Sequence, residues 1–200
     1  MNIVVLAGGL STERDVSLNT GTMVSKALRS KGHNVIMLDV FMGYHEEEED
    51  ITDIFNHTEE ASADVAQIPG EAPDIAQVKA MRKDQSACFF GPNVIKICQA
   101  ADIVFMALHG ENGENGKIQA AFDLFGIQYT GSRYLGSALA MDKGISKKMF
   151  EAAGIPTPHG IAMSKTQRHT PFSETGLTLP CVVKPCCGGS SIGVTIVRTA

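Results

Sequence analysis

Apolar runs and helical periodicity alternate along the first forty residues. Residues 2–7 are near-continuously apolar, as in strands that are buried on both faces of a parallel sheet. Gly8 and Gly9 end this run, and Thr12 followed by Asp15 has the spacing of a helix capping box. A stripe at helical spacing follows, made of Val16, Thr20, Met23, Val24, Ala27 and Leu28. Gly32 is expected to stop this helix, and residues 34–40 then form a second strand parallel to the first.

Residues 42–92 interrupt the alternation. They contain an acidic run at 46–50, three prolines and little periodicity. We expect an insertion with short helices, one of them over 74–83, lying outside the main sheet. The acidic run is typical of a solvated face, and a metal-binding role is the alternative.

The alternation resumes after residue 92. Helices are expected over 93–100, 117–125, 134–141 and 147–153, with strands over 102–108 and 127–130. This order predicts an α/β fold, a parallel sheet with helices on both faces. Residues 155–158 have the pattern of an extended linker and a candidate domain boundary. Residues 159–164 and 181–198 are expected to form strands of a second, antiparallel unit.

Composition narrows the class of protein. The 200 residues are 44% hydrophobic and 20% charged, which is ordinary for a globular chain. A net charge of −5 without a Lys/Arg cluster disfavours a nucleic-acid partner. The longest apolar run, 103–108, is too short for membrane insertion, and residues 1–7 lack the pattern of a signal peptide. Five cysteines without C-x-x-C spacing indicate a reducing, cytoplasmic location without structural disulfides or metal.

Residues 181–198 have the pattern of a strand–loop–strand hairpin with Lys184 at its base. Backbone N–H groups freed by Gly188, Gly189 and Gly193 can surround phosphate oxygens, and Lys184 adds positive charge. An ordinary hairpin loop of small residues is the alternative. Residues 189–193 also match the G-x-S-x-G pattern of hydrolases, but a β-branched run follows where that motif requires a helix. No P-loop is present, because Gly116-Lys117 is followed by isoleucine.

Two further loops are expected at the carboxyl edge of the sheet, where ligands of such folds bind: residues 8–15 and 109–116. Glu13 would lie at the start of a helix, where its carboxylate could hold an ammonium group or simply complement the helix dipole. His109 directly follows a buried strand, so it is either close to a ligand or an ordinary hydrogen-bonded loop residue. The first loop lacks the third glycine of a dinucleotide site, and the second lacks the terminal ligands of a calcium loop.

Together these segments resemble the N-terminal part of the D-alanine–D-alanine ligase family, ATP-grasp enzymes of peptidoglycan precursor synthesis. The matching segments occur in the family's order and comprise residues 7–17, 109–116, 129–132, 141–143, 153–158 and 183–193. The resemblance implies a Rossmann-like domain over 1–142, with the insertion at about 42–92, and the first part of an ATP-grasp domain over 143–200. It also implies that the magnesium ligands and a lid tyrosine lie past residue 200. The 200 residues alone are therefore expected to be inactive and to contain no metal ligand.

The implied reaction joins two D-alanine molecules and uses ATP and Mg²⁺ as cofactors. ATP phosphorylates the carboxylate of the first D-alanine, and the amine of the second attacks the resulting acyl phosphate. The family also implies a homodimer. Three alternatives stay open: a relative that uses D-serine or D-lactate, another ATP-grasp carboxylate–amine ligase, and a non-catalytic amino-acid-binding protein.

The resemblance assigns roles to individual residues. Glu13 would take the ammonium group of the first D-alanine, with Val16 and His109 lining its pocket. Ser190 would bond with Glu13 and the later tyrosine, so Glu13, His109 and Ser190 are the catalytic candidates. The ATP-phosphate contacts are expected from Lys143, Lys184, Gly188, Gly189, Ser190 and Ser191.

Two positions depart from the family pattern. Cys186 and Cys187 stand where relatives usually have polar residues. Little consequence is expected from them, because the loop would act through its backbone. Asn115 replaces the more usual aspartate, which argues against a charge role there.

Overall fold

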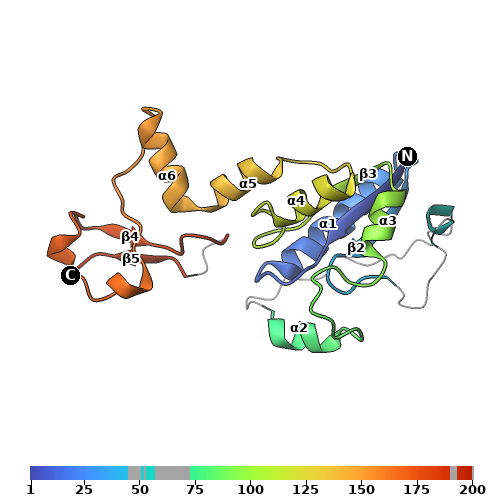
Figure 1. Ribbon diagram of the computed structural model, residues 1–200, viewed down its shortest axis with the longest axis horizontal. Helices are drawn as coiled ribbons and strands as arrows, with labels where there is room; N and C mark the ends of the chain where they lie inside the picture. The colour runs from blue at the N-terminus through green and yellow to red at the C-terminus, as the bar shows by residue number, and fades with distance from the viewer. Residues whose placement is uncertain (45–50, 52, 57–72, 190–192, 200) are drawn as a thin grey trace.

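A three-stranded parallel sheet forms the core of the half of the molecule that contains the N-terminus (Figure 1). The computed structural model describes residues 1–44, 51, 53–56, 73–189 and 193–199. Strand β1 (Asn2–Ala7) lies between β2 (Asn34–Asp39) and β3 (Ile103–Met106), in the order β2-β1-β3. Both pairs are parallel, with Ile3 opposite Val35 and Ile103. The predicted parallel α/β sheet is confirmed.

The expected strand over 127–130 is reduced to one isolated parallel bridge between Val104 and Tyr129. Two hydrogen bonds make this pairing: Val104 N donates to Gln128 O at 2.8 Å, and Thr130 N donates to Val104 O at 3.0 Å. Gly131, with a φ of 99°, then turns the chain away from the sheet edge. The predicted strand is therefore too short to extend the sheet by a full strand.

Alternate residues of β1 face opposite sides of the sheet, as the pleat requires. Ile3, Val5 and Ala7 belong to a buried cluster that Leu18, Val24 and Leu28 of α1 (Arg14–Arg29) cover. Val4 and Leu6 belong to the larger cluster on the other face. That face is covered by α3 (Val94–Ala100) and α4 (Lys117–Phe125), which contribute Ile97, Ile118 and Phe122.

Small residues form the face of α1 that lies against the sheet. Ser17, Gly21 and Ser25 are buried, whereas Met23 of the predicted stripe is 54% exposed. The stripe was wrong in this respect because the helix approaches the sheet closely: a Cβ on Gly21 would lie 2.8 Å from the Cβ of Ala7. Bulky residues pack only beside the line of contact.

The predicted capping box at the start of α1 is also wrong. The helix begins at Arg14 with Glu13 as its N-cap, and no side chain caps it. Ser11 rather than Thr12 offers a hydroxyl at this point, and it accepts a hydrogen bond from the Glu13 N–H at 3.1 Å. The Thr12 side chain is left exposed.

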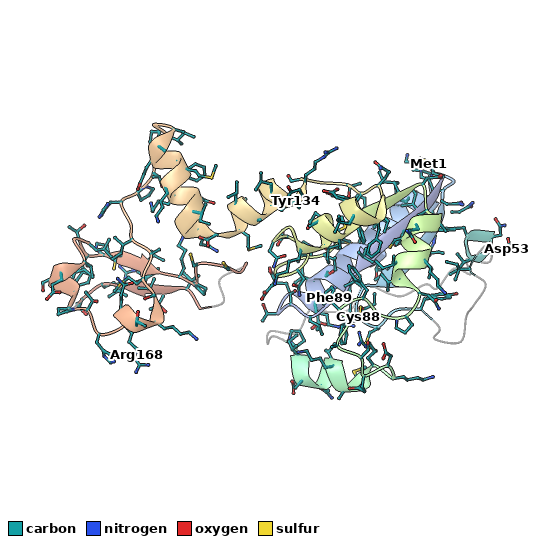
Figure 2. All side chains as sticks on the ribbon, viewed as in Figure 1. Met1, Asp53, Cys88, Phe89, Tyr134 and Arg168 are labelled. Carbon is teal, nitrogen blue, oxygen red and sulfur yellow. The ribbon has the colours of Figure 1, made fainter. Side chains whose placement is uncertain are left out.

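Short elements occupy the described part of the insertion: η1 (Ile54–Asn56) and α2 (Ile75–Met81). The latter confirms the helix expected over 74–83, and the Asp74 carboxylate caps it by accepting from Ala76 N and Gln77 N. Figure 2 shows Cys88 and Phe89 on the segment between α2 and the sheet. No strand occurs within the described part of 42–92. The acidic run at 46–50 lies outside the described residues.

Helices α5 (Tyr134–Met141) and α6 (Lys143–Ala152) lead from the sheet to a small antiparallel hairpin (Figure 1). The hairpin, β4 (Cys181–Val183) paired with β5 (Thr195–Val197), confirms the strand–loop–strand prediction. Two single-turn 3₁₀ helices, η2 (Lys165–Gln167) and η3 (Phe172–Glu174), precede it. Within the described part of the chain, no helix combines the length and apolar composition that a membrane crossing requires.

Two expectations for this part need correction. Helix α6 begins at Lys143, four residues before the predicted start at 147, because the Asp142 carboxylate caps it by accepting from Ile145 N at 2.9 Å. The strand predicted over 159–164 does not form, since no described strand lies beside it to pair with. None of the described residues after Ile127 is buried, so the core lies within the first part of the chain.

We predict that Gly21→Ala destabilises the protein, although alanine normally favours a helix. The added methyl group would lie 2.8 Å from the Cβ of Ala7, and overpacking of this kind costs about 1–3 kcal/mol. Gly136→Ala in α5 is the matched control, because a Cβ there meets nothing within 4 Å. The control is expected to be neutral or to stabilise by about 0.5–1 kcal/mol. Urea denaturation measures both, and an equal response of the two variants would contradict the close approach of α1.

Candidate active site

A buried serine joins the carboxyl ends of β1 and β3. Ser17 is fully buried; its hydroxyl accepts from Gly8 N at 2.9 Å and donates to Ala107 O at 2.8 Å. Both partners are backbone groups that have just left the strand ladder. The hydroxyl therefore holds the loops after the two strands at a fixed separation.

An ion pair fixes the turn that follows β1. Arg14 donates from Nη1 to Gly9 O at 2.7 Å, and its Nη2 pairs with Oδ2 of Asp39. The second oxygen of Asp39 accepts from Phe41 N at 2.9 Å and from Met42 N at 3.1 Å. The side chains are only 12% and 15% exposed, so water competes little for these bonds. The pair thus orients the first turn of α1 and the residue before it, Glu13.

Glu13 lies where three distant segments meet. Ser11, beside it, donates to His109 O at 2.7 Å and so connects the first loop to residues 109–116. A Cβ on Gly110 would lie 2.8 Å from Oε2 of Glu13, and a Cβ on Gly189 would lie 2.5 Å from the same oxygen. A side chain at either position would therefore displace the carboxylate from the place it occupies here. The structure therefore places the Glu13 carboxylate between the 109–116 loop and Gly189.

His109 lies on the same side, against α1. Its Nε2 is 3.0 Å from Oγ1 of Thr20, and the ring is half-buried. Glu13, Val16 and Thr20 are spaced three and four residues apart, which puts them on one face of the helix. In the sequence, Thr20 is marked only as a member of the predicted core stripe and not as a site residue. The signal that could have found it is this spacing from Glu13.

The 109–116 loop is held by its own polar side chains. Gly110 N donates to Oε2 of Glu114 at 2.6 Å, and the buried Gln119 donates from Nε2 to Gly113 O at 2.6 Å. Asn115 accepts from Lys117 N at 3.2 Å, at the start of α4. The glutamate and the glutamine are further residues near the site that no sequence motif marks.

Lys143 and Gly188 lie at the wall of a cleft of about 520 Å³. Lys143 donates from Nζ to Gly188 O at 2.8 Å. The cleft is lined by these two residues together with Met106, Leu108, Gly113, Glu114, Gln119, Thr130, Gly131, Ser132, Gly136, Ser137, Ala140, Met141 and Gly189. Gly189, which also touches Glu13, is the connection between this cleft and the loops at the sheet edge.

Other predicted residues are not brought into the cleft. The side chains of Glu13 and His109 lie beside it, and Val16 is half-buried on α1. Lys184 is exposed at the end of β4 and makes no hydrogen bond or ion pair with another described residue. Ser190 and Ser191 lie outside the described residues.

Asp142 precedes Lys143 of the cleft wall and accepts hydrogen bonds that shift its pKa. The hydrogen bond from Ile145 N, followed by one from the Cys186 thiol, lowers the pKa of Asp142. The hydrogen bond between Cys186 and Asp142 also raises the pKa of Cys186, because the carboxylate accepts the thiol proton.

Among the residues that the structure describes, no three His, Cys, Asp or Glu side chains are arranged to hold a metal ion.

Comparisons with known proteins agree on one family. The family model described as "D-ala D-ala ligase N-terminus" matches residues 2–132. The chain is 44% identical over 199 residues to the D-alanine–D-alanine ligase of Pediococcus pentosaceus, covering 99% of this chain and 56% of the relative. It is 42% identical over 201 residues to that of Lacticaseibacillus casei, covering 99% and 54%.

Solved structures give the same result. A Bacillus anthracis D-alanine–D-alanine ligase matches with a TM-score of 0.63 and 30% identity, covering the whole of this chain and 50% of the other. The same enzyme complexed with ATP matches with a TM-score of 0.65 and 28% identity, covering 49% of that chain. The chain thus spans about half the length of the curated relatives it matches.

We predict that Ser17→Ala destabilises the protein by about 1–3 kcal/mol, because it leaves the Gly8 N–H and the Ala107 carbonyl unpaired in the core. Ser30→Ala is the matched control, since Ser30 is exposed and donates only to Ala27 O at the end of α1. Chemical denaturation of both variants measures the difference. A Ser17→Ala variant as stable as the control would show that the serine does not join the two strand ends.

Proposed function

The chain belongs to the D-alanine–D-alanine ligase family, and on this premise we propose that the protein catalyses the ATP-dependent joining of two D-alanine molecules. The observation that best supports the proposal is the position of the Glu13 carboxylate between Gly110 and Gly189. One neighbour belongs to a loop at the sheet edge and the other to the glycine-rich segment beside Lys143. A group bound at Glu13 would therefore lie next to a group bound at the cleft.

The first D-alanine would bind through its ammonium group. A carboxylate accepts charge-assisted hydrogen bonds from ammonium donors, and these are stronger than neutral ones. Glu13 is held for this role by the Ser11 hydroxyl and by the turn that Arg14 fixes. His109, oriented by Thr20, and Val16 would line the pocket on the α1 side. Ser190 would complete the site by bonding with Glu13.

ATP would bind at the cleft with its phosphates toward Lys143 and the glycine residues. The residues present suit phosphate: Lys143 lies at the cleft wall, and Gly188 has a φ of 119° that only glycine adopts readily. ATP would supply the phosphoryl group that converts the first D-alanine's carboxylate to an acyl phosphate, with ADP as the leaving group. The amine of the second D-alanine would then attack the acyl carbon, releasing phosphate and a proton. Lys143, Lys184 and the backbone N–H groups of Gly188 and Gly189, with Ser190 and Ser191, would stabilise the negative charge on the phosphate oxygens.

Mg²⁺ belongs to the proposed reaction, but no described group of acidic side chains forms a ligand set for it. We therefore assign no magnesium ligand among these residues and derive no reaction step through the metal.

The proposed domains are residues 1–142, which include every buried described residue, and 143–200, which begin with α6. The product would serve peptidoglycan precursor synthesis in the cytoplasm, and the protein would act as a homodimer.

The proposal is tested with the protein expressed from its complete reading frame. Phosphate release from ATP is measured with D-alanine, L-alanine, D-serine or D-lactate added, and mass spectrometry identifies the product. D-alanine-dependent turnover that yields D-alanyl-D-alanine supports the proposal. Turnover that prefers another amine or hydroxy acid assigns a different ligase activity, and a folded protein without any such turnover contradicts it.

We predict that Glu13→Gln lowers kcat/KM for D-alanine by about 10²- to 10³-fold, because the amide keeps the shape but cannot neutralise an ammonium group. Asp15→Asn is the matched control: it removes a carboxylate from the same helix turn, away from Gly110 and Gly189. Steady-state kinetics in the complete protein measures both. Near-normal turnover in Glu13→Gln would refute the proposed role of this residue.

Lys143→Met is expected to raise the KM for ATP by about tenfold or more, since one charge-assisted phosphate contact is lost. Lys148→Met on the exposed side of α6 is the control and should leave the KM for ATP unchanged. A comparison of the two KM values decides the point. An equal, small effect in both variants would mean that Lys143 only packs against Gly188.

A further inference from the structure

Two adjacent thiols lie against one carboxylate where the glycine-rich turn, residues 186–189, meets the start of α6. Cys186 donates from Sγ to Oδ1 of Asp142 at 3.1 Å. Cys187 reaches Oδ2 of the same carboxylate with its Sγ at 4.0 Å. Both cysteines are exposed, so reagents in solution can reach them.

The contacts that hold the glycine-rich turn are concentrated at this junction. Lys143 N donates to Cys186 O at 3.0 Å, and Lys143 Nζ donates to Gly188 O at 2.8 Å. Gly188 N in turn donates to Sδ of Met141 at 3.4 Å. The Asp142 carboxylate thus serves two elements at once, because it caps α6 and accepts the Cys186 thiol.

Little space is left between the Cys186 sulfur and the start of α6. A Cβ on Gly144 would lie only 3.3 Å from Sγ of Cys186 and 3.2 Å from Oδ1 of Asp142. The expectation that the two cysteines have little consequence is therefore incomplete. The Cys186 side chain, and not the backbone alone, joins the glycine-rich turn to α6.

We propose that Cys187 is a modification site that takes a low-molecular-weight disulfide, and that its adduct separates the glycine-rich turn from Asp142 and Lys143. The contact of Cys187 with Asp142 is the longer of the two, so this thiol is the less firmly held. Cys186 is the poorer nucleophile, since its proton is held by the carboxylate and its pKa is raised. An adduct on Cys187 adds at least several heavy atoms beside a carboxylate that is already in contact with both sulfurs.

The chemistry is thiol–disulfide exchange. The Cys187 thiol loses its proton to solvent, and the thiolate attacks one sulfur of the small disulfide. A new S–S bond forms, the original S–S bond breaks, and the departing thiolate takes up a proton. A bridge between the two cysteines is disfavoured, because neighbouring Cα atoms are about 3.8 Å apart and disulfides usually need about 4.4–6.8 Å. The mixed disulfide is therefore the product.

The consequence for the nucleotide rests on the proposed function. The separated turn contains Gly188 and Gly189, which would contact ATP phosphates beside Lys143. Modification at Cys187 would then weaken nucleotide binding, and a reducing thiol would restore it. Nucleotide binding would in this way become sensitive to thiol oxidation.

The test treats the complete protein with 2-hydroxyethyl disulfide. Peptide mapping by mass spectrometry locates the adduct, and hydrogen–deuterium exchange follows peptides that cover residues 141–146 and 181–189. We expect an adduct on Cys187 ahead of Cys186, none on the buried Cys98, and about tenfold faster exchange in both peptides. Dithiothreitol should reverse the change. The wild-type measurement does not depend on how well any variant folds.

Two variants separate the site from other thiols. Cys187→Ser should abolish the exchange response, whereas Cys88→Ser should retain it, because Cys88 is also exposed but lies between α2 and the sheet (Figure 2). The proposal is overturned if Cys187 resists the reagent while Cys88 reacts, or if the Cys187 adduct leaves exchange unchanged. ATP affinity is measured separately. Absence of ATP binding in the untreated protein counts against the ligase proposal alone, and the exchange result still decides the modification site.

Discussion

The close approach of α1 to the end of β1 is the constraint on which the site depends. The approach requires a glycine at 21, where a Cβ would lie 2.8 Å from Ala7, and a small hydroxyl residue at 17. Ser17 then reaches backbone groups of both strand ends. Because α1 lies this close to the sheet, its first residues lie at the sheet edge, and Glu13 reaches the loop that follows β3. A helix held farther out by larger side chains would move the carboxylate away from Gly110.

Hydrogen bonds and one ion pair connect the buried end of the sheet to the loops beside the cleft. Arg14 and Asp39 hold the turn after β1, Ser11 connects it to His109, and Glu114 holds Gly110. On the other side of the cleft, Asp142 starts α6 and so presents Lys143 toward Gly188. Each of these side chains bonds to a backbone group, and Ser11 and Lys143 do so across segments that are distant in the sequence. Local backbone geometry, rather than a set of converging side-chain charges, therefore defines the candidate site.

The sequence was sufficient for the parts of the fold that follow from periodicity. The apolar run at 2–7, the helix at 117–125 and its stop at Gly126 agree with the structure, because burial and helix ends leave local signals. The buried face of α1 could not be predicted in this way. Its serines and glycine have low hydrophobicity. They are buried because α1 lies close to the sheet, and that distance is set only in the folded chain. The strand expected at 159–164 failed for a similar reason, since a strand requires a partner as well as a pattern.

Family motifs mark Glu13, His109, Lys143 and the glycine residues, and the roles assigned to them stay predictions. The residues that orient these groups could not be predicted, because Thr20, Glu114 and Gln119 are common residue types whose importance depends on contacts made in the folded chain.

The concentration of buried residues in the part of the chain up to Ile127 has a thermodynamic consequence. Heat capacity and denaturant sensitivity of unfolding scale with the area exposed. Calorimetry of these 200 residues should thus record the heat capacity increment of a chain of roughly two thirds that length.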